Sequence, residues 1–185
     1  MITVVTEGPF HERLLTLLLA DLAAGYGVQV IDGGSRDGAR PLARQFMILE
    51  RHAVVYAIDA DTVERERLLE QQHTLEWYFG LPANEGCAKV VQFVPTLEVI
   101  FFDRPAALER LIGRKLEPVL KIAGEIAPRA VLERGVPELA ERKLVDRLDE
   151  LTPKDLRALR THPSIASIRE FVQAHAEPEP LRRTA

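Results

Sequence analysis

Apolar and polar positions along the first half of the chain predict strands separated by helices. Short runs rich in β-branched residues, typical of strands, occupy residues 2–6, 28–32 and 53–59. Between them, apolar residues recur at the three- and four-residue spacing of amphipathic helices, over residues 9–24 and 37–51. Strands that alternate with helices of this length predict βαβ units, and therefore an α/β fold with a mainly parallel sheet and helices on both faces.

The pattern continues less regularly after the third run. Residues 62–78 are predicted to form a polar helix, and residues 80–86 form a loop by composition. Residues 89–95 and 99–102 are apolar and predict one strand, or two strands interrupted at Pro95.

From Arg104 onward the pattern predicts only helices. Amphipathic segments cover residues 105–120, interrupted near Pro118, and residues 137–151 and 163–174. Thr152 is a hydroxyl cap followed by a proline and an acid, which marks another helix start. We therefore expect three parts: an α/β domain over residues 1–103, a helical C-terminal extension over residues 104–175 and a flexible tail over residues 176–185.

Composition and charge narrow the class of protein. The hydrophobic fraction of 46% and charged fraction of 28% are those of a soluble globular protein. The net charge of -4 argues against nucleic-acid binding through bulk positive charge, but it leaves room for a local basic strip. Cys87 is the only cysteine, so no internal disulfide is expected and a cytoplasmic setting is the default. No apolar run is long enough to span a bilayer, so we expect no membrane association.

Carboxylates stand at the predicted ends of two strands. Glu7 follows the first strand, and Asp59 and Asp61 end the third. Because ligand sites of parallel sheets lie beyond the carboxyl ends of the strands, these side chains are expected to meet there. Alternate residues of a strand share a face, so Asp59 and Asp61 converge if the strand geometry continues to its tip. A divalent cation of the Mg²⁺ type would resolve the repulsion between them.

Each of these acids has a structural alternative. Asp59 could cap the following helix, with Asp61 in its first turn, and Glu7 could be a solvent-facing residue at a helix entry. Gly33-Gly34-Ser35 with Arg36 either holds a phosphate at a helix start or is ordinary turn chemistry, and glycine pairs are more often the latter.

The order of these motifs resembles the Toprim domain. Thr6-Glu7-Gly8 and Ile58-Asp59-Ala60-Asp61-Thr62 stand where that domain has its Glu-Gly and Asp-x-Asp motifs. The pattern is closest to the Toprim domains of overcoming-lysogenisation-defect (OLD) family nucleases and their stand-alone relatives. Those proteins carry a further small-hydroxyl-x-Glu element on a later strand, and Thr96-Leu97-Glu98 stands at that place. The resemblance covers residues 1–103.

The resemblance implies roles for these residues. Glu7, beside the motif glycine Gly8, would be a metal ligand or a general acid/base, and Asp59 and Asp61 would bind Mg²⁺ or Mn²⁺. Glu98, with Thr96 beside it, would complete a second metal position, and two cations suit phosphodiester hydrolysis. Lys121 is a further candidate for contact with a phosphate.

One position departs from the resembled pattern. The OLD relatives usually place an acidic residue four positions after the glutamate, whereas this chain has His11, followed by Glu12. Three alternatives follow: His11 ligates a metal such as Mn²⁺, Glu12 reaches the site from the next helical position, or the second metal is weak or absent.

The expected function is therefore metal-dependent cleavage of nucleic acid, either DNA or RNA. The main alternative is a non-catalytic or partner-activated subunit that binds another protein, such as an ATPase, through its C-terminal helices. Those helices could also form a homodimer. A small-molecule phosphotransfer enzyme is a third possibility, and it predicts a closed pocket rather than an open groove.

Overall fold

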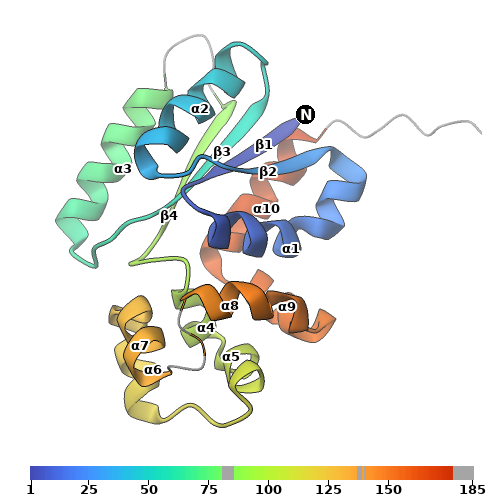
Figure 1. The fold of residues 1–185 in the computed structure, drawn as a ribbon. Coiled ribbons are helices and arrows are strands. Elements are labelled where there is room, and N and C mark those ends of the chain that lie inside the picture. The colour runs from blue at the N-terminus through green and yellow to red at the C-terminus, as the bar shows by residue number, and fades with distance from the viewer. Residues whose placement is uncertain (81–85, 137–138, 140, 177–185) are drawn as a thin grey trace, which may run out of the picture.

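A four-stranded parallel sheet forms the centre of the molecule (Figure 1). The computed structural model describes residues 1–80, 86–136, 139 and 141–176. The strands are β1 (Ile2–Thr6), β2 (Val28–Asp32), β3 (Ala53–Asp59) and β4 (Ala88–Phe93). They lie in the order β2-β1-β3-β4, and every neighbouring pair is parallel. The predicted α/β fold with a parallel sheet is confirmed, and all carboxyl ends of the strands lie at one edge.

Helices cover both faces of the sheet. One face packs against α1 (Pro9–Tyr26) and α10 (Pro163–His175), and the other against α2 (Arg36–Ile48) and α3 (Arg65–Phe79). Side chains along β3 point alternately to the two faces of the sheet. Val55 therefore belongs to the core on the α1 side, and Tyr56 belongs to the core on the α2 side. The helix predicted over residues 9–24 is α1, and the leucines at helical spacing along it are buried: Leu14, Leu15, Leu18, Leu19 and Leu22.

Short helices make up the extension, most of them below the sheet in Figure 1. They are α4 (Val99–Asp103), α5 (Pro105–Ile112), α6 (Pro118–Ile126), α7 (Pro128–Gly135), α8 (Glu141–Arg147) and α9 (Pro153–Arg160), with a 3₁₀ turn at Leu148–Glu150. The predicted start at Thr152 is a capping box with Asp155. A single buried core runs from the sheet into these helices, and α10 returns to pack on the sheet.

The structure corrects several element predictions. Residues 99–102 form helix α4 and not a strand. All four of their side chains are buried, and a short run that is apolar on every side has no periodicity to separate helix from strand. Helix α3 begins at Arg65 rather than residue 62, and α7 was not predicted. Residues 137, 138 and 140 of the predicted helix 137–151, and residues 177–185 of the tail, lie outside the described residues.

None of the helices in the described part of the chain combines the length and the apolar character needed to cross a membrane.

Candidate active site

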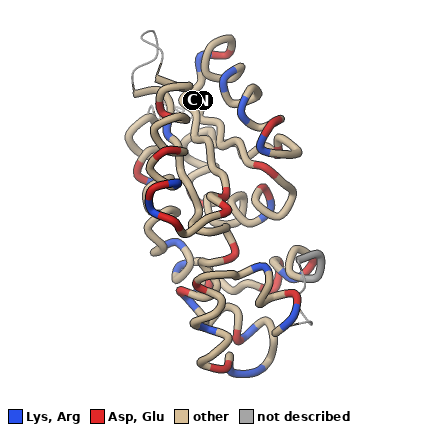
Figure 2. The backbone as a smooth tube through the Cα atoms, turned by 90° about the vertical axis from the view of Figure 1, so that its left-hand side faces the viewer, with Lys and Arg blue, Asp and Glu red and all other residues tan. Residues whose placement is uncertain are grey.

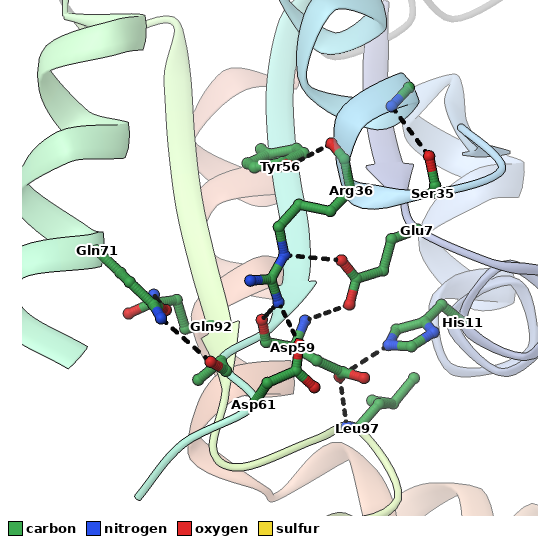
Figure 3. A network of polar contacts seen from close by, with 12 residues as sticks. Glu7, His11, Ser35, Arg36, Tyr56, Asp59, Asp61, Gln71, Gln92 and Leu97 are labelled. Carbon is green, nitrogen blue, oxygen red and sulfur yellow. Dashed lines mark hydrogen bonds and ion pairs between the residues drawn. The ribbon is translucent and has the colours of Figure 1, made fainter. Parts of the chain in front are cut away.

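Two of the predicted acids meet at the carboxyl edge of the sheet (Figure 3). Glu7 follows β1, and its Oε1 accepts a hydrogen bond from the backbone N–H of Asp59, the last residue of β3, at 3.0 Å. The side chain of Asp59 is fully buried and that of Glu7 is largely buried, with 0% and 11% exposed. Glu7 is therefore not a solvent-facing helix entry, and the adjacency of β1 and β3 in the sheet explains why the two acids meet.

His11 joins this pair from the first turns of α1. Its Nε2 lies 2.9 Å from Asp59 Oδ1, and both side chains are buried. Glu7, His11 and Asp59 each offer one ligand atom, and the three atoms all lie within 4.8 Å of one another. Glu12, one position further, is half-buried and is not part of this group. Of the two candidates at this position, the structure therefore brings His11 to the acids.

Gly8 supports this geometry at the start of α1. It is the N-cap residue, and its carbonyl accepts the backbone N–H of Glu12 at 3.0 Å. A Cβ at Gly8 would meet His11 Nδ1 at 4.0 Å, an ordinary contact. Gly8 thus begins the helix that carries His11, without a steric demand for glycine at this place.

Asp61 does not extend the strand face of Asp59. Strand β3 ends at Asp59, and Asp61 adopts a left-handed backbone with φ 54° while its N–H donates to the carbonyl of Pro95. Its carboxylate is 55% exposed and stands outside the group of three. The alternative that Asp59 caps the next helix is also wrong, because Glu64 is the N-cap of α3.

Thr96 and Glu98 lie on the turn that links β4 to α4, and not on a strand. Between them, the N–H of Leu97 donates to Asp59 Oδ1 at 2.7 Å, which ties this turn to the acidic group. Both side chains are buried, yet Thr96 Oγ1 and Glu98 Oε2 have no hydrogen-bond partner among the described residues. A buried carboxylate oxygen without a partner is costly, so a further cation or polar partner at this turn would be stabilising.

Two arginines reach the acids from different helices. Arg36, the first residue of α2, donates from Nε to Glu7 at 3.3 Å and from Nη2 to Asp61 at 2.7 Å and to the carbonyl of Asp59 (Figure 3). The preceding glycine pair is turn chemistry: Gly34 N–H donates to Asp32, and a Cβ at Gly33 would lie 2.4 Å from the Cα of Ala39. The turn therefore delivers Arg36 to the site.

Arg129 comes from α7, in the extension. Its guanidinium donates to Glu98 Oε1 at 3.0 Å and to Asp59 Oδ2, and it lies 3.8 Å from Asp61. Sequence reasoning missed this residue, because no local motif marks it and its region mixes arginines with acids. Lys121, in contrast, is exposed on α6, where its charge acts on Glu109. Among the described residues, no ion pair or side-chain hydrogen bond links Lys121 to the acidic group.

The acids and cations shift each other's ionisation. Burial raises the pKa of Glu7, and the Asp59 charge adds to that, while the Asp59 N–H, Arg36 and His11 oppose it. For His11, burial lowers the pKa, but the hydrogen bond and charge of Asp59, with the charges of Glu98 and Glu7, outweigh it and raise the pKa overall. The raised pKa favours the protonated form of His11 next to Asp59, and a metal that binds through His11 would compete with that proton.

The donor set fits a divalent cation. One imidazole nitrogen and two carboxylates in reach of each other, with an unpartnered Glu98 oxygen nearby, are ligands for a divalent transition metal. An imidazole ligand is poorly suited to Mg²⁺, which prefers oxygen ligands alone. Arg36 and Arg129 hold the same carboxylates through flexible side chains, so a cation and the guanidinium groups compete for them.

Solved structures share this fold, although no family model and no curated protein matches the sequence. The C-terminal region of the Burkholderia pseudomallei OLD protein has a TM-score of 0.53 and 16% identity, covering 94% of this chain and 96% of that chain. The C-terminal region of the Xanthomonas campestris pv. campestris OLD protein has a TM-score of 0.52 and 11% identity, covering 94% of each chain.

These comparisons confirm the resemblance to OLD proteins at the level of the fold. The chain has the fold of OLD C-terminal regions, which agrees with the Toprim-like pattern found in the sequence. The likeness covers 94% of the chain, whereas the sequence motifs covered only residues 1–103, so the helical extension belongs to the shared fold.

Proposed function

We propose that this chain is a Toprim-type, metal-dependent nuclease that hydrolyses phosphodiester bonds in nucleic acid. The observation that carries the proposal is the buried group Glu7, His11 and Asp59 at the carboxyl edge of the sheet. Four carboxylates gather there when Asp61 and Glu98 are included, and two arginines and a histidine face them. Three of these carboxylates, Glu7, Asp59 and Glu98, are largely or fully buried, which is costly in a stable core and is typical of a site that holds a cation.

Each residue has a role in this proposal. Glu7, His11 and Asp59 would bind the first cation, and Glu98 with Thr96 would bind a second beside it. A bound cation supplies positive charge over the reacting phosphate and lowers the pKa of a water molecule. Glu7 has two alternative roles in this proposal: it is a ligand of the first cation, or it stays unbound and is the general acid/base, since burial and the charge of Asp59 raise its pKa. Asp61 is exposed, and it pairs with Arg36 and Arg129 on the solvent side of the site.

The arginines would change partners when a cation and a substrate bind. A cation on Asp59 and Glu98 weakens the hold of these acids on Arg129, whose side chain is partly exposed. Its guanidinium group can then turn its parallel N–H donors toward a phosphate, which it binds in a bidentate manner. Arg36 donates to the backbone carbonyl of Asp59 and can do the same. We place these two residues, rather than Lys121, as phosphate contacts.

A cleavage assay tests the proposal. Single-stranded DNA, duplex DNA and RNA are incubated with Mg²⁺ or Mn²⁺ and wild type, Glu7→Gln, Asp59→Asn or the control Asp149→Asn. Asp149 is an exposed acid that pairs with Arg13, and among the described residues neither of them has an ion pair with the acidic group. We expect metal-dependent cleavage by wild type and control and its loss in the other two. Circular dichroism and thermal melting check that the variants fold.

Absence of cleavage by folded wild type under every condition would count against an enzyme active on its own. The second candidate would then take its place: a non-catalytic or partner-activated subunit, held by a protein such as an ATPase. The charge pairing of Arg36 and Arg129 with the acids favours this candidate, because internal cations already neutralise much of the site. Calorimetry with Mn²⁺ then separates a partner-activated subunit, which keeps its metal site, from a non-catalytic subunit without a metal site, which gives no binding heat.

A further inference from the structure

Three arginines lie in a row on α2. Arg36, Arg40 and Arg44 are four residues apart, so they share one face of the helix. The row begins inside the acidic site with Arg36 and leads away from it, rising about 6 Å per step. Figure 2 shows positive and negative positions interspersed over the molecule, which makes a row of one sign on one helix face a local feature.

The outer two arginines stack on an aromatic ring from α3. The guanidinium carbons of Arg40 and Arg44 lie 5.3 and 4.9 Å from the ring centre of Tyr78. Across the described residues, no ion pair joins either of them to a carboxylate, whereas Arg13 and Arg169 are both paired in this way. Stacking on a ring leaves the N–H donors at the guanidinium edge available to another acceptor.

A cavity of about 280 Å³ lies between α2 and α3, directly beside the row. Tyr56 and Ile58 of β3 and Leu75 of α3 give it apolar walls. Polar groups of Arg36, Arg40 and Gln71 line it as well. Its volume is at the lower end of ligand sites, about 300 Å³, and suits one planar heterocycle with polar edges.

We infer that the groove between α2 and α3 binds an unpaired stretch of the substrate strand, next to the phosphate that lies at the acidic site. Phosphates would follow Arg36, Arg40 and Arg44, and one base would enter the cavity. This inference rests on the proposed nuclease function and specifies the form of its substrate. A base reaches such a cavity only when it is free of its partner strand, so the preferred polymer is single-stranded.

The net charge of the protein indicates that a small, defined set of cations would have to bind the phosphates. The net charge of -4 supplies no general attraction to a polyanion, so phosphate contacts must come from a defined set of cations. Asp37 and Glu70 also line the cavity. Their carboxylates can accept hydrogen bonds from the amino groups of a base, but they repel phosphate, which places the phosphates on the arginine side.

Fluorescence anisotropy measures this binding apart from cleavage. A labelled oligothymidylate, an oligouridylate and a DNA duplex of the same length are titrated with the full chain at several salt concentrations without divalent metal. We expect tighter binding of the single strands than of the duplex. Arg40→Gln and Arg44→Gln should each weaken binding several-fold and reduce the slope of log affinity against log salt by about 0.7.

Arg157→Gln is the matched control, because Arg157 is an exposed arginine on α9 and its loss changes the net charge equally. Arg40→Lys and Arg44→Lys separate binding from packing: they keep the charge, so they should retain most of the affinity even if loss of stacking on Tyr78 lowers the melting temperature. Thr74→Phe, at a cavity-lining position, should weaken single-strand binding without changing the salt slope.

Equal affinity for duplex and single strand would overturn the inference, as would Arg40→Gln and Arg44→Gln variants that behave like Arg157→Gln. The inference and the proposed function fail in different ways. Binding that depends on Arg40 and Arg44, without cleavage in any metal, contradicts only the nuclease proposal. Cleavage that is indifferent to these arginines contradicts only the inferred groove.

Discussion

The acidic site and a second charged cluster, further along α1, use the same residue types for different purposes. In the second cluster, the carboxylate of Asp21 on α1 pairs with Arg160 of α9 and Arg169 of α10 at 3.1 and 2.7 Å. One acid there faces two arginines, and the acid is 44% exposed. In the site, Asp59 is fully buried and shares its cations with three other carboxylates.

The difference lies in charge balance and burial. The Asp21 cluster has cations in excess and joins the returning helices to α1, a role in stability. Arg160 and Arg169 reinforce it by donating to the carbonyl of Leu18 at 2.9 and 3.0 Å. In the site, four carboxylates face two arginines and one histidine, and three of the four are largely or fully buried, an arrangement that costs stability and suits cation binding. Four predictions test this contrast, from the largest expected effect to the smallest.

The first prediction concerns catalysis. Asp59→Ala should reduce the cleavage rate by about 10³-fold or more, since it removes the acid that the proposed cation, His11 and Arg129 share. Asp21→Ala should leave the rate unchanged. Initial rates with Mn²⁺ at matched folded fractions measure both. Similar losses in the two variants would show that the site acts through stability alone.

The second prediction concerns the cations of the site. Arg129→Ala removes a positive charge that pairs with the buried carboxylates of Asp59 and Glu98. This should lower the free energy of unfolding by about 3 kcal/mol without metal. Added Mn²⁺ should recover much of this loss, because the cation takes the place of the guanidinium group. Arg169→Ala should cost less and show no recovery. Denaturant unfolding with and without Mn²⁺ measures this, and equal recovery in both variants contradicts the proposed metal centre.

The third prediction concerns metal choice. His11→Glu places an oxygen ligand where the chain has an imidazole, so the ratio of affinities for Mn²⁺ and Mg²⁺ should fall by about tenfold. Calorimetric titration with each metal measures the ratio. Glu12→Gln is the control, since Glu12 is not part of the acidic group. If Glu12→Gln changes the ratio and His11→Glu does not, Glu12 rather than His11 is the metal ligand.

The fourth prediction concerns the Asp21 cluster and pH. The hydrogen bond from Arg169, opposed by partial burial and aided by Arg160, lowers the pKa of Asp21 from 3.8 to about 2. A carboxylate with a lowered folded-state pKa stabilises the fold above its unfolded pKa, and this stability is lost as the pH falls from 3.8 to about 2.

Asp21→Asn should therefore cost no more than about 1 kcal/mol at neutral pH, because the carboxylate is partly exposed and screened by solvent. The difference from wild type should shrink as the pH falls through this window. Unfolding curves at neutral pH and near pH 3 measure it. A difference that grows toward acid would contradict the assignment of the shift to Asp21.

The core of the site was predictable from local patterns. The acids Glu7 and Asp59 follow strands whose sequences are unambiguous, and parallel strands place their carboxyl ends at one edge. The order of the motifs predicted Glu98 near the site but on a strand. It precedes helix α4 instead, because residues 99–102 carry no periodicity that separates helix from strand. Asp61 was expected to share a face with Asp59, and a left-handed backbone at its own position prevents this.

The amino-acid sequence by itself determined the α/β fold, the edge of the sheet that carries the site, and Glu7 and Asp59 within it, because strand patterns and strand ends are local properties. Only the tertiary structure decided that His11 rather than Glu12 faces the acids, and that Arg129 of α7 reaches Asp59. Those contacts depend on how a helix is rotated and on where the extension docks. Packing over the whole chain sets both, and no short motif records them.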